Sequence, residues 1–390
     1  MEKNTQINQV IKYVYIHVPF CLKKCNYCSF FSIEFSQEAG NRFVAYLVKE
    51  INLFKQQYNI IPKTIYFGGG TPSLLTATQI NLIISQFNTS QTNEITLECN
   101  PVNINIEFVK ELKTTKINRI SLGAQSFIDG ELKILGRLHK ADGISHSVKL
   151  LRSHGYDNIS LDLIYGLLNQ TKEDVEFSLD EIIQHNPEHI STYCLSLEED
   201  VPLFSERDKI PTDEKVAEFY YLIRTKLISA GYDHYEISNF AKQALESKHN
   251  LSYWNDEHYL GLGPSAAGYL HLNSKLDCHP EQNRREDCLL RYTNPANLEL
   301  YYNMLDDNRI MTERTFLNED EHEKEFIFLG LRKAIGLDLN EFENRFETNF
   351  TEKYGHIINK FRNLLEINDG KIKLKPEAYF ISNEIFSEFM

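Results

Sequence analysis

The chain has 390 residues, of which 42% are hydrophobic and 25% charged, an ordinary globular composition. Its formal net charge of −14 argues against a general nucleic-acid binder, because such proteins need a basic face to displace counterions. No run of about 18 apolar residues occurs, and the N-terminal segment lacks an apolar signal core with a small-residue cleavage site. We therefore expect a cytoplasmic protein without a membrane span. Transient contact with a membrane surface is compatible with this expectation.

Short apolar segments alternate with longer amphipathic ones up to about residue 230. The apolar segments are rich in β-branched and aromatic residues, which predicts buried strands, and Gly, Pro or Asn usually follows them. Between them lie segments with helical spacing, such as the stripe of Phe43, Leu47 and Ile51. This β-α order predicts a parallel sheet, and six units predict a partial, TIM-like (β/α)6 barrel with its chemistry on loops at the carboxyl ends of the strands. The predicted strands are 13–18, 63–67, 94–98, 119–123, 158–166 and 189–197.

The pattern changes after residue 230. Residues 231–292 are rich in aromatic residues and glycine and are weakly periodic, whereas helical patterns dominate after them. Residues 364–375 (LLEINDGKIKLK) predict a hairpin with an Asn-Asp-Gly turn. We therefore expect an α/β protein in three parts: a barrel over 1–230, a connecting region over 231–292, and a smaller, mainly helical domain over 293–390.

Three of the seven cysteines, Cys21, Cys25 and Cys28, follow the first predicted strand directly. An odd count with a tight N-terminal trio favours a reducing compartment and metal or cluster binding over a disulfide framework. A structural zinc site usually takes four ligands from two separated pairs, and the chain has no second C-x-x-C. In a cubane [4Fe–4S] cluster each iron takes a thiolate, so a trio leaves one iron open. The spacing predicts such a cluster; a partial zinc site or three buried thiols are the alternatives.

The spacing C-x3-C-x2-C, with Tyr27 before the last cysteine, resembles the signature of radical S-adenosylmethionine (SAM) proteins. In that family the open iron binds the amino and carboxylate groups of SAM, and reductive cleavage yields methionine and a 5′-deoxyadenosyl radical. The sequence GGGTP after the second predicted strand agrees with this resemblance, since glycines let backbone carbonyls approach the ligand's ammonium group. We therefore expect SAM contacts from Gly68, Gly69, Gly70 and Thr71.

Further motifs narrow the resemblance to the oxygen-independent coproporphyrinogen III oxidase family, over the chain to about residue 270. They are YIHVPFC, GGGTPS, LECNP, SLGAQSF, GRLHK, LDLIYGL and YEISNFA. Carboxylates accept from ribose hydroxyls, Gln both donates and accepts, and Arg pairs with a carboxylate, so the chemistry suits SAM. For any one residue alone, a capping or solvated role is the alternative. The positions that the resemblance implies as SAM contacts are Tyr15, Glu98, Gln125, Arg137 and Asp162.

That family has at least two branches. The oxidase branch decarboxylates two propionates of coproporphyrinogen and carries a fourth cysteine two residues after the trio, together with a long N-terminal arm. Here Phe30 stands at that position, and only residues 1–12 precede the first predicted strand. The branch of HemW-type haem chaperones lacks the fourth cysteine and carries H-N-x-x-Y-W, which this chain has at 249–254.

By this resemblance, His249 is expected to bind haem, because a neutral imidazole is a good axial ligand for haem iron. The alternative is that His249 and Trp254 simply hold a loop in place. The leading hypothesis is a chaperone that binds a SAM-ligated [4Fe–4S] cluster and haem and delivers haem to client haem proteins, respiratory-chain components among them. The electron donor and any catalytic residue are left unassigned. The alternatives are an oxygen-independent coproporphyrinogen III oxidase and a structural iron–sulfur protein with vestigial SAM residues.

Overall fold

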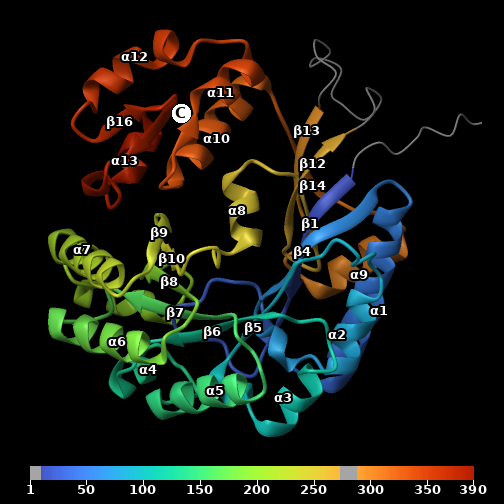
Figure 1. The fold of residues 1–390 in the computed structure, drawn as a ribbon. Coiled ribbons are helices and arrows are strands. Elements are labelled where there is room, and N and C mark those ends of the chain that lie inside the picture. The colour runs from blue at the N-terminus through green and yellow to red at the C-terminus, as the bar shows by residue number, and fades with distance from the viewer. Residues whose placement is uncertain (1–9, 273–287) are drawn as a thin grey trace, which may run out of the picture.

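The structure is a computed structural model that describes residues 10–272 and 288–390 (Figure 1). One sheet runs through it in the order β14-β13-β12-β11-β1-β4-β5-β6-β7-β8-β10-β9. The six predicted barrel strands are present and pair in parallel with their neighbours, which confirms the partial (β/α)6 barrel. They are β1 (Val10–Val18), β4 (Asn59–Gly69), β5 (Glu94–Cys99), β6 (Arg119–Gln125), β7 (Ile159–Tyr165) and β8 (His189–Cys194).

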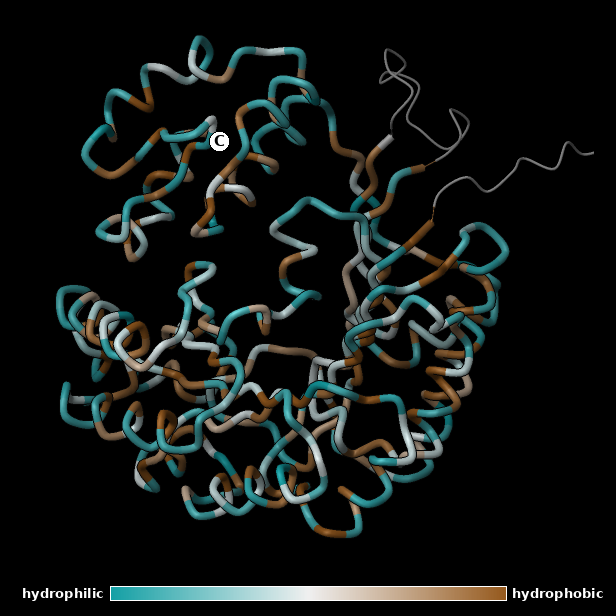
Figure 2. The backbone as a smooth tube through the Cα atoms, viewed as in Figure 1, coloured by the Kyte–Doolittle hydropathy of each residue, from teal (hydrophilic) through white to brown (hydrophobic). Residues whose placement is uncertain are grey.

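Helices cover the outer face of the barrel (Figure 1). The predicted apolar stripe of α1 is buried at Phe43, Leu47 and Ile51, so the helical period points its hydrophobic side at the sheet. Figure 2 shows hydrophobic stretches recurring along strands and helices between hydrophilic loops. The helices are α1 (Gln37–Lys55), α2 (Ala77–Ile84), α3 (Ile106–Leu112), α4 (Asp129–Ile134), α5 (Ala141–Ser153), α6 (Lys172–His185) and α7 (Asp213–Ser229). No helix in the described ranges is long and apolar enough to cross a membrane.

The segment that follows α7 adds strands to both ends of the barrel sheet. β9 (Asp233–Glu236) and β10 (Asn239–Ala241) extend it beyond β8. The chain then crosses over through α8 (Lys248–Trp254) to β11 (Tyr259–Leu262), which is parallel to β1. These strands are only three or four residues long, too short to show a period in the sequence. Residues 273–287 of the predicted connecting region lie outside the described residues.

After the described chain resumes, antiparallel strands and helices complete the molecule. β12 (Ala267–Leu272), β13 (Cys288–Thr293) and β14 (Glu313–Leu317) form the far end of the large sheet, with α9 (Leu298–Asp306) between the last two in sequence. The predicted hairpin is confirmed as β16 (Leu365–Asn368) and β17 (Lys371–Leu374). It joins β15 (Leu337–Asp338) in a small sheet accompanied by α10 (Glu319–Arg332), α11 (Leu339–Phe346), α12 (Phe350–Lys360) and α13 (Ser382–Ser387).

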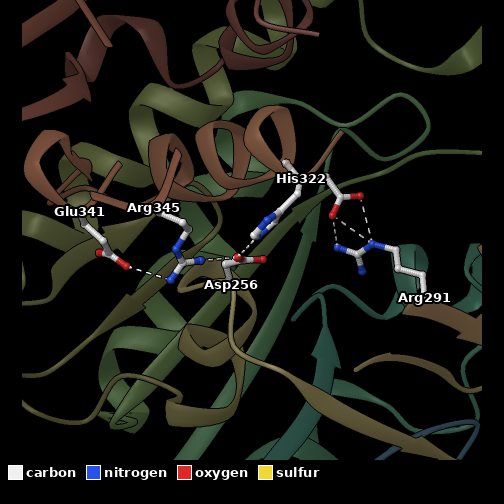
Figure 3. Close-up of polar contacts among 6 residues, drawn as sticks. Asp256, Arg291, His322, Glu341 and Arg345 are labelled. Carbon is white, nitrogen blue, oxygen red and sulfur yellow. Dashed lines mark hydrogen bonds and ion pairs between the residues drawn. The ribbon is translucent and has the colours of Figure 1, made fainter. Parts of the chain in front are cut away.

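A buried carboxylate ties the C-terminal helices to the loop after α8 (Figure 3). The side chain of Asp256 is only 2% exposed and accepts hydrogen bonds from Nε2 of His322 on α10 and Nη1 of Arg345 on α11, both at 2.7 Å. The backbone of Asp256 is left-handed, with φ 54°. A charged group buried so deeply is stable only with such partners, so this junction positions α8 relative to the C-terminal domain.

Candidate functional site

A cavity of about 450 Å³ lies at the carboxyl ends of the barrel strands. Most of the predicted site residues line it, contributed by the loop after β1, by β4 to β7 and the turns that follow them, and by the segment after α4. Tyr15, Gly68 and His249 are not among the residues that line it; they lie behind its wall. The predicted residues in the lining are Cys21, Cys25, Cys28, Gly69, Gly70, Thr71, Glu98, Gln125, Arg137 and Asp162.

The loop that carries the cysteine trio is fastened at both its base and its middle. Two short strands, β2 (Phe20–Cys21) and β3 (Ile33–Glu34), pair in parallel and close its base. In the middle, the backbone amide of Asn26 donates to the carbonyl of Leu135 at 3.0 Å. The loop conformation therefore depends on the segment after α4 as well as on β1.

Side-chain hydrogen-bond donors lie beside two of the three thiols. Thr71 Oγ1 donates to Cys21 Sγ and Arg137 Nη1 donates to Cys25 Sγ, each at 3.5 Å. Burial raises the pKa of the Cys28 thiol, so metal binding would have to deprotonate it. No three His, Cys, Asp or Glu side chains of the described chain converge on a site for a single ion.

The glycine run at the end of β4 leaves no room for side chains. Gly69 has φ +104°, in the left-handed region, which L residues with a side chain rarely adopt. A Cβ on Gly70 would lie 2.4 Å from the carbonyl oxygen of Phe20, and one on Gly68 would lie 2.9 Å from the ring of Tyr15 and 3.2 Å from Glu98 Oε1. Gly69 and Gly70, which line the cavity, present bare backbone to it, as a ligand bound along them would require.

Two carboxylates, Glu98 and Asp162, line the cavity from within the barrel. Burial raises the pKa of Glu98 to about 7 and raises that of Asp162. The hydroxyl of Tyr66 donates to Glu98 at 2.8 Å, and that of Ser121 donates to Asp162 at 3.3 Å. Buried carboxylates with unused acceptor capacity suit the hydroxyl groups of a polar ligand.

Several buried polar atoms of the cavity have no partner in the described structure. They are Oε1 of Gln125 and the Nε atoms of Arg119 and Arg137. Gln125 also has φ +64°, which is a strained backbone for a residue with a side chain. Since buried polar groups are nearly always satisfied, these atoms indicate a polar or charged ligand, and the donor set fits both a cluster and SAM.

Arg119 and Tyr66 line the cavity but were not among the predicted site residues. Arg119 is only 2% exposed, and its charge opposes the rise that burial causes in the pKa of Glu98 and of Asp162. A charged residue that opens a predicted buried strand, RISLG, was a signal that could have identified it. Tyr66 gave no such signal, because an aromatic residue is ordinary in a strand.

Phe30 lines the cavity and is 64% exposed, so it lies at the opening. Its ring is therefore mostly open to solvent, and the residues that follow it lead into β3. At the position where the oxidase branch is expected to have a fourth thiol, this chain presents an exposed aromatic ring.

His249 lies behind the cavity wall, 1% exposed. Its Nδ1 is 2.7 Å from Thr64 Oγ1 and its Nε2 is 2.8 Å from the hydroxyl of Tyr253, so both ring nitrogens have partners. Burial lowers its pKa to about 3, which keeps the ring neutral. Its neighbour Asn250, not His249, lines the cavity.

The other end of the same motif contacts the C-terminal domain. The guanidinium of Arg332 on α10 lies over the ring of Trp254, 4.3 Å from its centre, and a cation over an indole face is attracted by the ring quadrupole. Helix α8 therefore contacts the barrel at its first turn and the C-terminal helices at its last.

Comparisons with known proteins agree with this geometry. Residues 15–182 match the Radical SAM superfamily, and residues 317–381 match the HemN C-terminal domain. The chain is 33% identical to the protein named Heme chaperone HemW of Lactococcus lactis subsp. lactis, over 96% of each chain. It is 31% identical to the Bacillus subtilis protein of the same name, over 97% of this chain and 99% of the other. The solved structure of coproporphyrinogen III oxidase (HemN) from Escherichia coli superposes with a TM-score of 0.81 over 97% of this chain and 90% of that one; at 20% identity this shows the shared fold.

Proposed function

Because the chain belongs to the HemW family of radical SAM proteins, we propose that it is a haem chaperone that binds a SAM-ligated [4Fe–4S] cluster and haem and delivers haem to client haem proteins. The observation that carries the choice over the oxidase is Phe30. It is exposed at the cavity opening where the oxidase branch has its extra cysteine. The proposal places the protein in the cytoplasm, with respiratory-chain components among its clients and transient membrane contact during delivery.

Cys21, Cys25 and Cys28 would hold the cluster, and the iron left open would supply the site for SAM and the electron for its cleavage. Arg137, which donates to Cys25 Sγ, would hold the carboxylate of SAM by a charge-assisted pair. Glu98 and Asp162 would accept from its ribose hydroxyls, with Gln125 as a further donor or acceptor. The bare backbone of Gly68, Gly69, Gly70 and Thr71 would receive the ammonium group, and Tyr15 would support that backbone from behind.

His249 is the proposed haem ligand, but both of its ring nitrogens already have hydrogen-bond partners. An iron bond at Nδ1 must replace the contact with Thr64 on β4, and one at Nε2 must replace the contact with Tyr253 on α8 itself. Because His249 is only 1% exposed, its surroundings must also open for haem to reach either nitrogen. Leaving one buried polar group unpaired costs about 1–3 kcal/mol. Since His249 also packs on Tyr66, haem binding and SAM binding would be coupled, and such coupling is reciprocal.

The test is anaerobic reconstitution of the full chain followed by two measurements. Iron content should fall strongly in Cys21→Ala, Cys25→Ala and Cys28→Ala but stay unchanged in Cys194→Ala, a thiol outside the trio. Haem titration should give a Soret band that weakens in His249→Ala. Production of protoporphyrinogen from coproporphyrinogen III with SAM and reductant would overturn the chaperone in favour of the oxidase, and an unchanged Soret band in His249→Ala would overturn the ligand.

A further inference from the structure

A chain of four hydrogen bonds connects the cavity to the beginning of α8. In the cavity, Ser160 Oγ donates to Asp162 Oδ1 at 3.5 Å, and behind it Nδ1 of His189 lies 2.8 Å from the same Oγ. The other ring nitrogen of His189, Nε2, lies 2.8 Å from the hydroxyl of Tyr235 on β9. That hydroxyl accepts from the backbone amide of Ser247, the residue that caps α8, at 3.4 Å. The chain therefore joins β7, β8 and β9 to the helix that follows them.

The two ends of this chain give it a direction. A backbone amide can only donate and a carboxylate can only accept, whereas hydroxyl groups and a neutral imidazole do both. If each member between the ends accepts one bond and donates the next, Tyr235 donates to Nε2 of His189. Its Nδ1–H then donates to Ser160, which donates to Asp162. This direction assigns the ring proton of His189 to Nδ1, because the partner of one imidazole nitrogen fixes the state of the other.

The surroundings of His189 keep its ring neutral, as the chain requires. His189 and Ser160 are both fully buried, and burial, assisted by the charge of Arg119, lowers the pKa of His189. A protonated imidazole would donate from both nitrogens and could not accept from Tyr235. A buried histidine with two hydroxyl partners is usually only a satisfied core residue. Here, however, one of the two hydroxyl groups also contacts a carboxylate that lines the cavity.

We propose that His189 is a positioning residue for Asp162 and makes the hydrogen bonding of this carboxylate depend on the position of α8. This inference rests on the proposed function, in which Asp162 accepts from the ribose of SAM and α8 carries the haem ligand. If the amide of Ser247 moves away, the hydroxyl of Tyr235 can accept from Nε2 of His189 instead of donating to it. Nδ1 then accepts from Ser160, which no longer donates to Asp162. A shift of α8 thereby removes one of the hydrogen bonds that orient a proposed SAM ligand, and such coupling acts in both directions.

The test removes only the hydroxyl of Tyr235, in Tyr235→Phe, and makes two measurements on the full chain. Nitrogen-15 NMR of the cluster-free protein shows which ring nitrogen of His189 carries the proton, and the signal is identified by its absence from His189→Asn. We expect Nδ1 in the wild type and a proton moved wholly or partly to Nε2 in Tyr235→Phe, because Nε2 has lost its donor. The affinity of the reconstituted protein for SAM should fall roughly threefold to tenfold.

Two further comparisons separate positioning from general damage to the fold. Tyr232→Phe is the matched control, because the buried hydroxyl of Tyr232 donates to the carbonyl of Pro187 at 2.9 Å, outside the chain. It should leave both the SAM affinity and the His189 signal unchanged. His189→Asn, whose amide can still donate to Ser160, should bind SAM more tightly than His189→Leu, which can donate to nothing.

The outcomes keep this inference apart from the proposed function. A wild-type His189 that carries its proton on Nε2 overturns the inference. A Tyr235→Phe protein in which either the ring proton of His189 or the SAM affinity is unchanged overturns it as well. A wild type that gains its cluster but does not bind SAM would instead overturn the proposed function. The NMR measurement needs neither cluster nor SAM, so it decides the direction of the hydrogen-bond chain in either case.

Discussion

The imidazole of His249 stacks on the ring of Tyr66, with centroids 5.1 Å apart and planes at 26°. Tyr66 in turn donates its hydroxyl to Glu98, a carboxylate of the cavity. His249, the haem ligand expected from the sequence, thus packs against Tyr66. Tyr66 in turn orients Glu98, which is proposed to contact SAM. This relationship makes the effect of His249 on SAM binding measurable apart from its effect on haem.

We expect His249→Ala to weaken SAM binding roughly tenfold, about 1.4 kcal/mol. The substitution leaves a void beside Tyr66 and removes the partner of Thr64 Oγ1, so the Tyr66 hydroxyl loses its fixed position against Glu98. The measurement is the SAM affinity of the reconstituted protein without haem. His146→Ala, at an exposed position on α5, is the control and should keep the wild-type affinity. Equal SAM affinities of His249→Ala and the wild type would contradict the prediction.

The barrel was predictable because its strands and helices have strong, regular periods, as in α1. The ends of the sheet were not, because β9, β10 and β11 are too short to show a period, and β10 and β11 pair with strands distant in sequence. The trio and the glycine run were predictable as motifs, since their chemistry depends on local spacing. The burial of His249 was not, because it is set by Thr64 and Tyr66, nearly two hundred residues earlier, and a motif does not say which way its side chains point.

Glu50 should make the stability of the protein depend on pH. It is fully buried and accepts from the amide of Gly263 at 2.8 Å, the hydroxyl of Tyr301 at 2.7 Å and Nδ2 of Asn294 at 2.7 Å. Burial nevertheless raises its pKa from 4.5 to about 7. Because the folded pKa exceeds the unfolded one, its favourable contribution is fully present below pH 4.5 and is lost as the pH rises through 7.

The expected loss between about pH 4.5 and 8 is on the order of 3 kcal/mol for this group. Glu98 acts in the same direction, since its pKa is also raised to about 7. Urea unfolding across this range should therefore show a smaller fall in free energy for Glu50→Gln than for the wild type, whatever the absolute stability of the variant. Glu299→Gln, whose parent side chain is 65% exposed, should show the same fall in unfolding free energy with pH as the wild type. An equal fall for Glu50→Gln and the wild type would refute the raised pKa of Glu50.

Gly70→Ala should disturb the cavity wall and the cluster loop together. The new Cβ would lie 2.4 Å from the carbonyl oxygen of Phe20, the residue before Cys21, so one of the two backbones must shift. We expect a loss of about 2–3 kcal/mol in unfolding free energy, in the range of overpacked sites, and a lower iron content after reconstitution. Gly130→Ala is the control, because a Cβ there meets nothing within 4 Å, and it should match or slightly exceed the stability of the wild type. A Gly70→Ala protein as stable as Gly130→Ala would contradict this account.

Asp256→Asn should loosen the C-terminal helices from the loop after α8. Asn tolerates the left-handed backbone at this position, so the variant removes the charge but not the turn. His322 and Arg345 lose an ionic partner; Arg345 keeps Glu341 at 3.2 Å, which limits the expected cost to about 2–3 kcal/mol. Hydrogen exchange should speed up in α10 and α11 before it does in the barrel strands. Asp307→Asn, which removes a charge from an exposed ion pair, is the control and should lower the unfolding free energy by under about 1 kcal/mol. Unchanged hydrogen exchange in α10 and α11 of Asp256→Asn would show that Asp256 does not hold the junction.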